Sequence, residues 1–169
     1  ALALYGFGAS AHIVIQIARH RGCDVYVFTR SASHRAHARR LGAAWVGTAE
    51  DRPPTRVDHA IIFAPAGALV PAALSVLNRG GTVALAGIHM SAIPALDYTR
   101  HLYHERTLRS VANATRRDGE ELLAVAAELP VQTQVSVFPL ERAHEALIAL
   151  KTGGIDGAAV LRVGGAPGR

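Results

Sequence analysis

The sequence is poor in cysteine, with Cys23 as the single thiol among 169 residues. One cysteine cannot form a disulfide within the chain, and this usage is typical of a reducing compartment. One thiol also cannot supply a four-cysteine zinc site. We therefore expect a cytoplasmic protein without a disulfide framework, and we assign no metal ligands to this chain.

Long hydrophobic runs are also missing, since no stretch of about 18 apolar residues occurs. The chain is therefore not expected to enter a membrane. It opens on Ala-Leu-Ala-Leu-Tyr, which has no charged leader and resembles the interior of a strand rather than a signal peptide. Because natural chains rarely begin inside a strand, we expect a truncated amino terminus.

Aromatic residues make up only 5% of the chain, whereas hydrophobic residues make up 50%. This mixture suits buried parallel strands covered by helices of small residues. The formal net charge is +5, and many arginines fall within residues 30–40. That basic stretch has three interpretations: a solvated helix face, a nucleic-acid patch, or a pocket for an anionic cofactor. We favour the first and third, and expect no nucleic-acid partner.

Short apolar runs alternate with amphipathic stretches along residues 1–130. The runs predict strands at residues 1–5, 24–29, 44–46, 59–63, 82–86 and 107–112, and the amphipathic stretches predict helices at residues 11–20, 69–77 and 117–128. A further helix, capped by Ser31 or Ser33, is expected to run to Leu41, and residues 88–104 form an irregular connection. The pattern predicts an α/β fold with a doubly wound, six-stranded parallel (Rossmann) sheet.

The last stretch has a different pattern. Polar and apolar residues alternate over 132–138, which predicts a half-exposed strand, and a helix at 141–150 and a strand at 157–163 follow. We divide the chain into a dinucleotide-binding domain at 1–130, a C-terminal segment at 131–163 and a tail at 164–169.

The strongest motif is Gly6-Phe7-Gly8-Ala9-Ser10-Ala11, directly after a strand and directly before a helix. Gly6 permits the tight turn, Gly8 lets a pyrophosphate approach the backbone, and Ala11 lets the helix pack close to the strand. The helix amino terminus then offers free N–H groups to phosphates. We predict that the cofactor contacts of this turn come from Gly6, Phe7, Gly8, Ala9 and Ser10.

The second strand ends about 20 residues later, where NAD-specific sites place a carboxylate on the adenosine ribose. Here it ends in Phe28-Thr29-Arg30-Ser31, without an acidic side chain. Arg30 is suited to a 2′-phosphate, Thr29 and Ser31 offer hydroxyl groups, and Arg35 lies one helical turn further on. We therefore predict binding of NADP in preference to NAD. In the alternative interpretation, Arg30 lies in solvent or stacks on adenine without discriminating.

Several ordered segments together resemble the medium-chain dehydrogenase/reductase family, and more narrowly its zinc-type alcohol dehydrogenases. The matching segments are Tyr5-Gly6-Phe7-Gly8, Leu41-Gly42-Ala43, Leu77-Asn78-Arg79-Gly80-Gly81-Thr82, Ala86-Gly87-Ile88, Phe138-Pro139-Leu140, Glu145-Ala146-Leu147, Gly153 and Val160-Leu161. The similarity covers nearly the whole chain, and it implies that residues 131–163 return into a catalytic domain that is otherwise missing.

The resemblance implies further cofactor contacts after the later strands. Ala64 and Pro65 are expected near the cofactor ribose, Gly87 and Ile88 beside the nicotinamide, and Asn113 in the same region. In full-length relatives, hydride passes between NAD(P) and an alcohol or aldehyde, and zinc polarises the substrate oxygen. The resemblance also implies a homodimer formed through the sixth strand, with Leu102, Tyr103 and Leu108 fitting an interface and a core equally well.

The sequence departs from the family pattern in two ways that affect its expected activity and cofactor contacts. The zinc ligands of the relatives lie in an amino-terminal domain that has no counterpart here, so this chain by itself is expected to be inactive. Many relatives also carry an arginine shortly before the final strand, where Ala158 falls in this sequence. Part of the phosphate contact is therefore expected to be missing or moved.

Nine histidines raise the possibility of a metal site, but the only tight cluster is His101-Leu102-Tyr103-His104-Glu105. Its order does not fit the zinc motif in which two histidines bracket a glutamate, so we expect surface or interface histidines. His12 opens the first helix, which leaves two interpretations: it faces the phosphates, or it faces solvent as a histidine at a helix start usually does. The apolar stripe of that helix is predicted to be Ile13, Val14, Ile17 and Ala18.

Other functions remain open at this point. A zinc-free quinone or enoyl reductase of the same superfamily would have a similar nucleotide-binding half. An S-adenosylmethionine-dependent methyltransferase also uses a Leu-x-x-Gly-Gly turn, as at residues 77–81, but normally needs an acidic residue after its second strand. A non-catalytic nucleotide sensor is the third alternative. A short-chain dehydrogenase is disfavoured because Lys151, the single lysine, is preceded four residues earlier by Leu147 rather than tyrosine.

Overall fold

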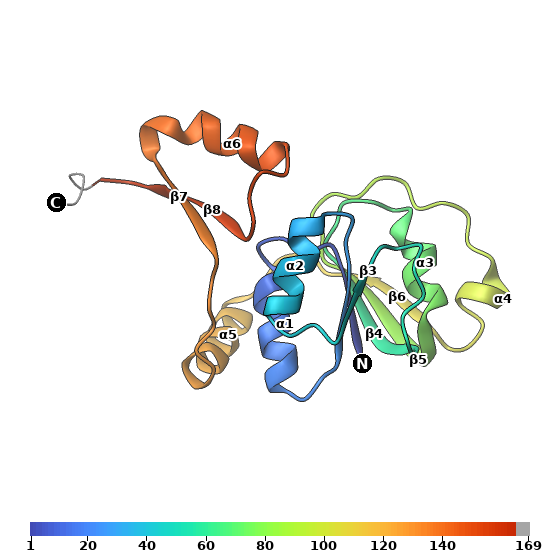
Figure 1. Cartoon of the computed structure of the whole chain (residues 1–169). Coiled ribbons are helices and arrows are strands. Elements are labelled where there is room, and N and C mark those ends of the chain that lie inside the picture. Colours follow the sequence, from blue (N-terminus) through green and yellow to red (C-terminus); the bar gives the residue numbers. More distant parts are fainter. Residues whose placement is uncertain (165–169) are drawn as a thin grey trace.

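A computed structural model of the chain describes residues 1–164 (Figure 1). Residues 165–169, which make up most of the predicted tail at 164–169, lie outside the described residues. Within 1–164, no helix is both long enough and apolar enough to cross a membrane.

Six parallel strands form the main sheet, in the order β3-β2-β1-β4-β5-β6. They are β1 (Leu2–Tyr5), β2 (Val25–Phe28), β3 (Trp45–Gly47), β4 (Val57–Ile62), β5 (Leu77–Leu85) and β6 (Thr107–Ser110). The order reverses between β1 and β4, and such a switch point is where open parallel sheets bind ligands. The predicted doubly wound fold is confirmed.

Helices cover both faces of this sheet. In Figure 1, α1 (Ala11–His20), α2 (Ala32–Arg40) and α5 (Arg116–Glu128) lie on one side, and α3 (Leu69–Ser75) and the short α4 (Tyr98–His101) lie on the other. Because successive strand residues point to opposite faces, Leu4 and Tyr5 belong to different core clusters. Leu4 packs with Phe7 and Ile15 on the α1 side, and Tyr5 packs in the cluster that contains Leu74 of α3.

Some predicted boundaries were wrong. β5 begins at Leu77 rather than at residue 82, because Gly80 and Gly81 lie within the strand, whose register against β4 is irregular there. The connection at 88–104 contains the helix α4. The buried residues of α1 are Ala11, His12, Ile15 and Ala18, so Ala18 is the one member of the predicted stripe that is buried.

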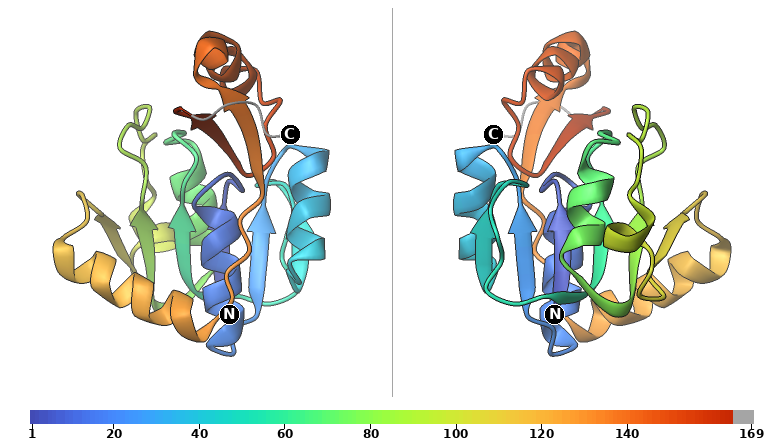
Figure 2. Two further views of the ribbon diagram at one scale, coloured as in Figure 1. Left: turned by 90° about the vertical axis from the view of Figure 1, so that its left-hand side faces the viewer. Right: turned by 90° about the vertical axis from the view of Figure 1, so that its right-hand side faces the viewer.

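The C-terminal segment forms a second, smaller unit above the carboxyl ends of the main strands (Figure 2). It consists of β7 (Val135–Pro139), the 3-10 turn η1 (Leu140–Arg142), α6 (Ala143–Lys151) and β8 (Ala158–Arg162), and β7 pairs in parallel with β8. β7 alternates between exposed and half-buried residues, as predicted. Several large apolar side chains of this unit are exposed, namely Val135, Val137, Leu147, Leu150, Val160 and Leu161.

Candidate nucleotide-binding site

The glycine-rich turn joins the carboxyl end of β1 to the amino terminus of α1. Gly6 has a φ of +89°, which side chains with a Cβ rarely adopt, and a Cβ there would lie 3.0 Å from the backbone nitrogen of Ala64. Two backbone N–H groups, of Phe63 and Ala64, donate to the carbonyl oxygen of Tyr5. The turn is therefore held against the residues that follow β4, which brings Gly6 and Ala64 together.

Gly8 faces open space, because a Cβ built there would meet no atom within 4 Å. Within residues 1–164, the backbone N–H groups of Gly8, Ala9, Ser10 and Ala11 donate no hydrogen bond. These four donors lie at the start of a ten-residue helix, where the helix dipole is positive. The arrangement offers an uncovered backbone surface with unsatisfied N–H groups to an anion.

Phe7 differs from its neighbours in the turn. Its side chain is buried among the residues that pack α1 against the sheet, so only its backbone can contact a ligand. Ala11 is completely buried, and its small side chain lets α1 approach the strands closely. Ala9 and Ser10 are exposed.

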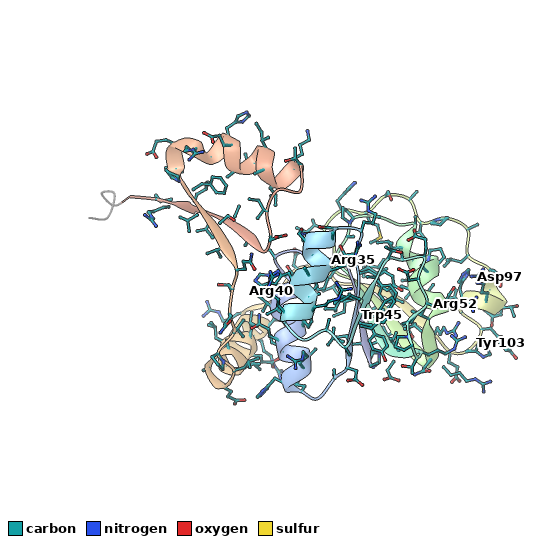
Figure 3. All side chains as sticks on the ribbon, viewed as in Figure 1. Arg35, Arg40, Trp45, Arg52, Asp97 and Tyr103 are labelled. Carbon is teal, nitrogen blue, oxygen red and sulfur yellow. The ribbon has the colours of Figure 1, made fainter. Side chains whose placement is uncertain are left out.

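The predicted ribose site lies where β2 ends and α2 begins. Ser31 caps α2 by accepting a hydrogen bond from the N–H of His34. Arg35 lies on α2 (Figure 3), and its Nη1 donates to the carbonyl oxygens of Thr29 and Arg30, at 2.8 Å in each case. Arg30 is exposed, with no side-chain partner among residues 1–164. Arg35 therefore orders the turn with one nitrogen, while the Arg30 guanidinium is free.

A carboxylate that the local sequence does not indicate lies beside the predicted ribose site. Asp156, in the loop between α6 and β8, accepts a hydrogen bond of 2.9 Å from Ser33 Oγ and lies 3.5 Å from His34 Nε2. Ser33 in turn shares a 2.8 Å hydrogen bond with Ser31. Sequence inspection missed this carboxylate because 123 residues separate Asp156 from Ser33.

His12 is buried, with 1% of its surface exposed, and not solvent-facing as expected. Its Nδ1 lies 3.3 Å from the Gly8 carbonyl oxygen, and its Nε2 accepts a hydrogen bond of 3.4 Å from the N–H of Gln134. A neutral ring protonated on Nδ1 satisfies both contacts. Gln16, one turn later on α1, exchanges two hydrogen bonds with the backbone of Gln132. Helix α1 thus links the glycine-rich turn to the C-terminal segment.

Beside His12 lies a second buried histidine, His37 of α2, at a ring separation of 5.7 Å. Burial lowers the pKa of His37, and the nearby positive charge of Arg40 lowers it further. His101 is also buried, which contradicts the expectation of surface or interface histidines. Within residues 1–164, no three His, Cys, Asp or Glu side chains are grouped so that they could hold a metal ion.

The remaining predicted residues all follow the carboxyl ends of strands. Ala64 and Pro65 come after β4, Gly87 and Ile88 after β5, and Asn113 after β6. The carbonyl oxygen of Pro65 accepts from the N–H of Ser91, and the Ser91 hydroxyl accepts from the N–H of Gly67, so these two loops are tied together. The Ile88 side chain is fully exposed. Asn113 is exposed and has a φ of +62°.

Comparisons with known proteins agree with this geometry. Residues 11–128 match the family described as zinc-binding dehydrogenase. A probable alcohol dehydrogenase of Mycobacterium tuberculosis, AdhA, is 48% identical over 162 residues, which are 96% of this chain and 47% of that protein. The chain spans about half the length of the curated relatives it matches.

Many solved structures share the fold, and two of them contain NAD or NADP(H). The acetophenone reductase of Geotrichum candidum, in complex with NAD, superposes with a TM-score of 0.83 at 22% identity, over 95% of this chain and 47% of that one. CAD of Helicobacter pylori, complexed with NADP(H), superposes with a TM-score of 0.80 at 18% identity, over the same shares of the two chains.

Proposed function

Because this chain belongs to the zinc-binding dehydrogenase family, as its Rossmann portion, we propose that it is the cofactor-binding part of an alcohol dehydrogenase. In this proposal, residues 1–130 bind a nicotinamide dinucleotide, and residues 131–163 pack on a catalytic domain. The observation that carries the proposal is the open backbone at Gly8, beside four N–H groups without an acceptor in residues 1–164.

The cofactor would lie along the carboxyl edge of the sheet. The N–H groups of Gly8, Ala9 and Ser10 would hold the pyrophosphate, as helix amino termini do in dinucleotide-binding folds. Gly6 and the backbone of Phe7 shape the turn. The adenosine ribose would lie beside Thr29, Arg30, Ser31 and Arg35, and the nicotinamide end beside Ala64, Pro65, Gly87, Ile88 and Asn113.

The charges near the ribose favour NADP over NAD. Arg30 and Arg35 provide two guanidinium groups for a 2′-phosphate, and guanidinium forms strong paired hydrogen bonds with phosphate. Asp156 opposes this preference by repelling a 2′-phosphate, because its carboxylate accepts a hydrogen bond from Ser33 at the same end of α2. Two cations outweigh one carboxylate, so NADPH should bind more tightly than NADH. Calorimetric titration of the chain with both would test this, and tighter binding of NADH would refute it.

The bound nicotinamide would supply hydride transfer between NAD(P) and an alcohol or aldehyde in the full-length protein. This chain's residues hold and orient that ring. Zinc has no ligand set within residues 1–164, so any zinc ligands would belong to the part of the relatives that the chain does not cover. The chain alone should therefore bind cofactor without oxidising alcohols, and measurable alcohol oxidation by it would contradict this.

A homodimer through β6 is a further part of the proposal. Among residues 1–164, β6 is an edge strand that pairs only with β5, and Val111 directly after it is exposed. Of the three residues predicted for the interface, Leu102 and Leu108 pack against the core. Tyr103, which lies beside α4 in Figure 3, is exposed and therefore available to a partner. Sedimentation of the wild-type chain should give a dimer that Val111→Lys converts to a monomer. A monomeric wild type would refute this arrangement.

A further inference from the structure

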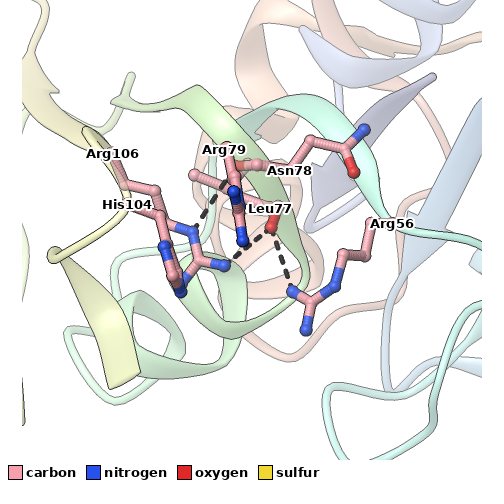
Figure 4. Close-up of a pocket in the computed structure, with 6 residues that line it drawn as sticks. All are labelled: Arg56, Leu77, Asn78, Arg79, His104 and Arg106. Carbon is pink, nitrogen blue, oxygen red and sulfur yellow. Dashed lines mark hydrogen bonds between the residues drawn. The ribbon is translucent and has the colours of Figure 1, made fainter. Parts of the chain in front are cut away.

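The edge of the sheet opposite the glycine-rich turn carries a cluster of arginines. Arg56 directly precedes β4, Arg79 lies near the start of β5, and Arg106 directly precedes β6. Because the strands are parallel, their amino ends gather at this edge. The three arginines line a cavity of about 540 Å³ together with Leu77, Asn78 and His104 (Figure 4). That volume lies within the range of about 300–1,000 Å³ found for small-molecule sites.

Backbone carbonyl groups hold two of these guanidinium groups in place. Nη1 of Arg56 donates to the carbonyl oxygens of Ser75 and Leu77, at 2.9 and 3.0 Å. Nη2 of Arg106 donates to the same oxygen of Leu77 at 3.0 Å, so both cations meet at one acceptor. Figure 4 shows Arg56 on one side of the Leu77 carbonyl, and Arg79 and Arg106 on the other. The cations are thus positioned in advance, without a ligand.

The positive charge of this cluster has no carboxylate partner. Within residues 1–164, no Asp or Glu forms an ion pair with Arg56, Arg79 or Arg106. The nearby Asp58 instead accepts a hydrogen bond from the side chain of Asn78. Burial lowers the pKa of Arg106, and the like charge of Arg56 lowers it further. An anion bound here would therefore relieve a repulsion that the protein leaves uncompensated.

We propose that this arginine cavity is a second anion site, separate from the cofactor site, and that it binds a phosphate group, either free or as a phosphomonoester of a small molecule. Arg79 is its adaptable contact, because within residues 1–164 its side chain has no hydrogen-bond partner and is free to turn onto a ligand. Arg56 and Arg106 keep free guanidinium N–H groups beside their backbone contacts. Guanidinium is the side-chain group best suited to phosphate oxygens.

The test uses the full 169-residue chain and inorganic phosphate as the probe, titrated against chloride at constant ionic strength and followed by amide chemical shifts. We expect shifts at Arg79, His104 and Arg106. Arg79→Ala should weaken this binding about tenfold, the usual loss for one hydrogen bond to a charged group. Arg39→Ala is the matched control, since it removes an exposed arginine of α2 that does not line the cavity, and it should leave the affinity unchanged.

Two further arms complete the experiment. Arg35→Ala should leave the phosphate-induced shifts at the arginine cavity intact. Loss of these shifts in Arg35→Ala would mean that phosphate binds at the proposed cofactor site, and this result would overturn the inference. Equal weakening by Arg39→Ala and Arg79→Ala would overturn it as well, because it would indicate general charge screening. Tighter binding of glycerol phosphate than of inorganic phosphate would identify a phosphorylated small molecule as the ligand, and equal or weaker binding would identify free phosphate.

Discussion

Alanine substitutions at Gly6 and Gly8 should separate folding from cofactor binding, although only one residue lies between the two sites. In Gly6→Ala, the new Cβ must accept a φ of +89°, at a cost of about 1–2 kcal/mol. It would also lie 3.0 Å from the Ala64 nitrogen and 3.2 Å from the Ala64 Cβ, and such overpacking costs about 1–3 kcal/mol. The free energy of unfolding should therefore fall by about 2–5 kcal/mol, a large part of the roughly 5–15 kcal/mol typical of a domain.

Gly8→Ala should leave stability almost unchanged, because its φ lies outside the left-handed region and its Cβ meets no atom within 4 Å. A change within about 0.5 kcal/mol is expected, as for other surface substitutions. The same Cβ would occupy the space through which the pyrophosphate approaches the N–H groups of Ala9 and Ser10. Loss of one hydrogen bond to a charged group, worth about 1.5–3 kcal/mol, would raise the Kd for NADPH about 10- to 100-fold.

Urea denaturation measures the first effect and calorimetric titration with NADPH measures the second. Unchanged NADPH affinity in Gly8→Ala would refute the assignment of the pyrophosphate to this turn. Unchanged stability in Gly6→Ala would refute the close packing of the turn against Ala64.

Three other predictions concern buried or paired side chains. Asp156→Asn should raise the affinity for NADPH relative to the affinity for NADH about fivefold, since removing a carboxylate near the 2′-phosphate is worth roughly 1 kcal/mol. An unchanged ratio of the two Kd values would show that Asp156 does not face the 2′-phosphate. Tyr5→Phe should stabilise the fold by about 1 kcal/mol in urea denaturation, because the Tyr5 hydroxyl is buried without a hydrogen-bond partner in residues 1–164. The Tyr5 ring stacks on Phe28 with 4.3 Å between the ring centroids, and phenylalanine keeps this contact. A loss of stability would reveal a hydrogen bond to that hydroxyl. Because the pKa of His37 is lowered in the folded chain, His37 takes up a proton in the unfolded chain first as the pH falls. The contribution of His37 to stability is therefore present above its ordinary pKa of about 6.5 and is lost as the pH drops below that value. Urea midpoints measured from pH 8 to pH 5 should fall less steeply in His37→Gln than in the wild type, and equal slopes would contradict this account.

Features encoded by local sequence could be predicted well. The turn at residues 6–11 depends on two glycines and one alanine at fixed spacing, and its position between a strand and a helix is set by the neighbouring apolar pattern. The Ser31 cap of α2 is likewise local, because its partner is the N–H of His34. The six strands and their parallel order follow from the alternation of apolar runs with helices.

Features built from distant segments could not be predicted. His12 is polar and opens a helix, yet the return of the chain at Gln134 buries it. Asp156 reaches α2 for the same reason, because the C-terminal segment lies above the carboxyl ends of the strands. The arginine cavity combines residues 56, 79 and 106, which no sequence spacing connects. In each case, tertiary packing decides which polar groups meet.

The most direct test of the central claim is a titration of the chain with NADPH, followed by backbone amide chemical shifts. The account predicts the largest shifts at Gly8, Ala9 and Ser10, with further shifts at Ser31 and along the other loops at the carboxyl edge. Absence of binding, or shifts confined to the opposite edge of the sheet, would contradict it.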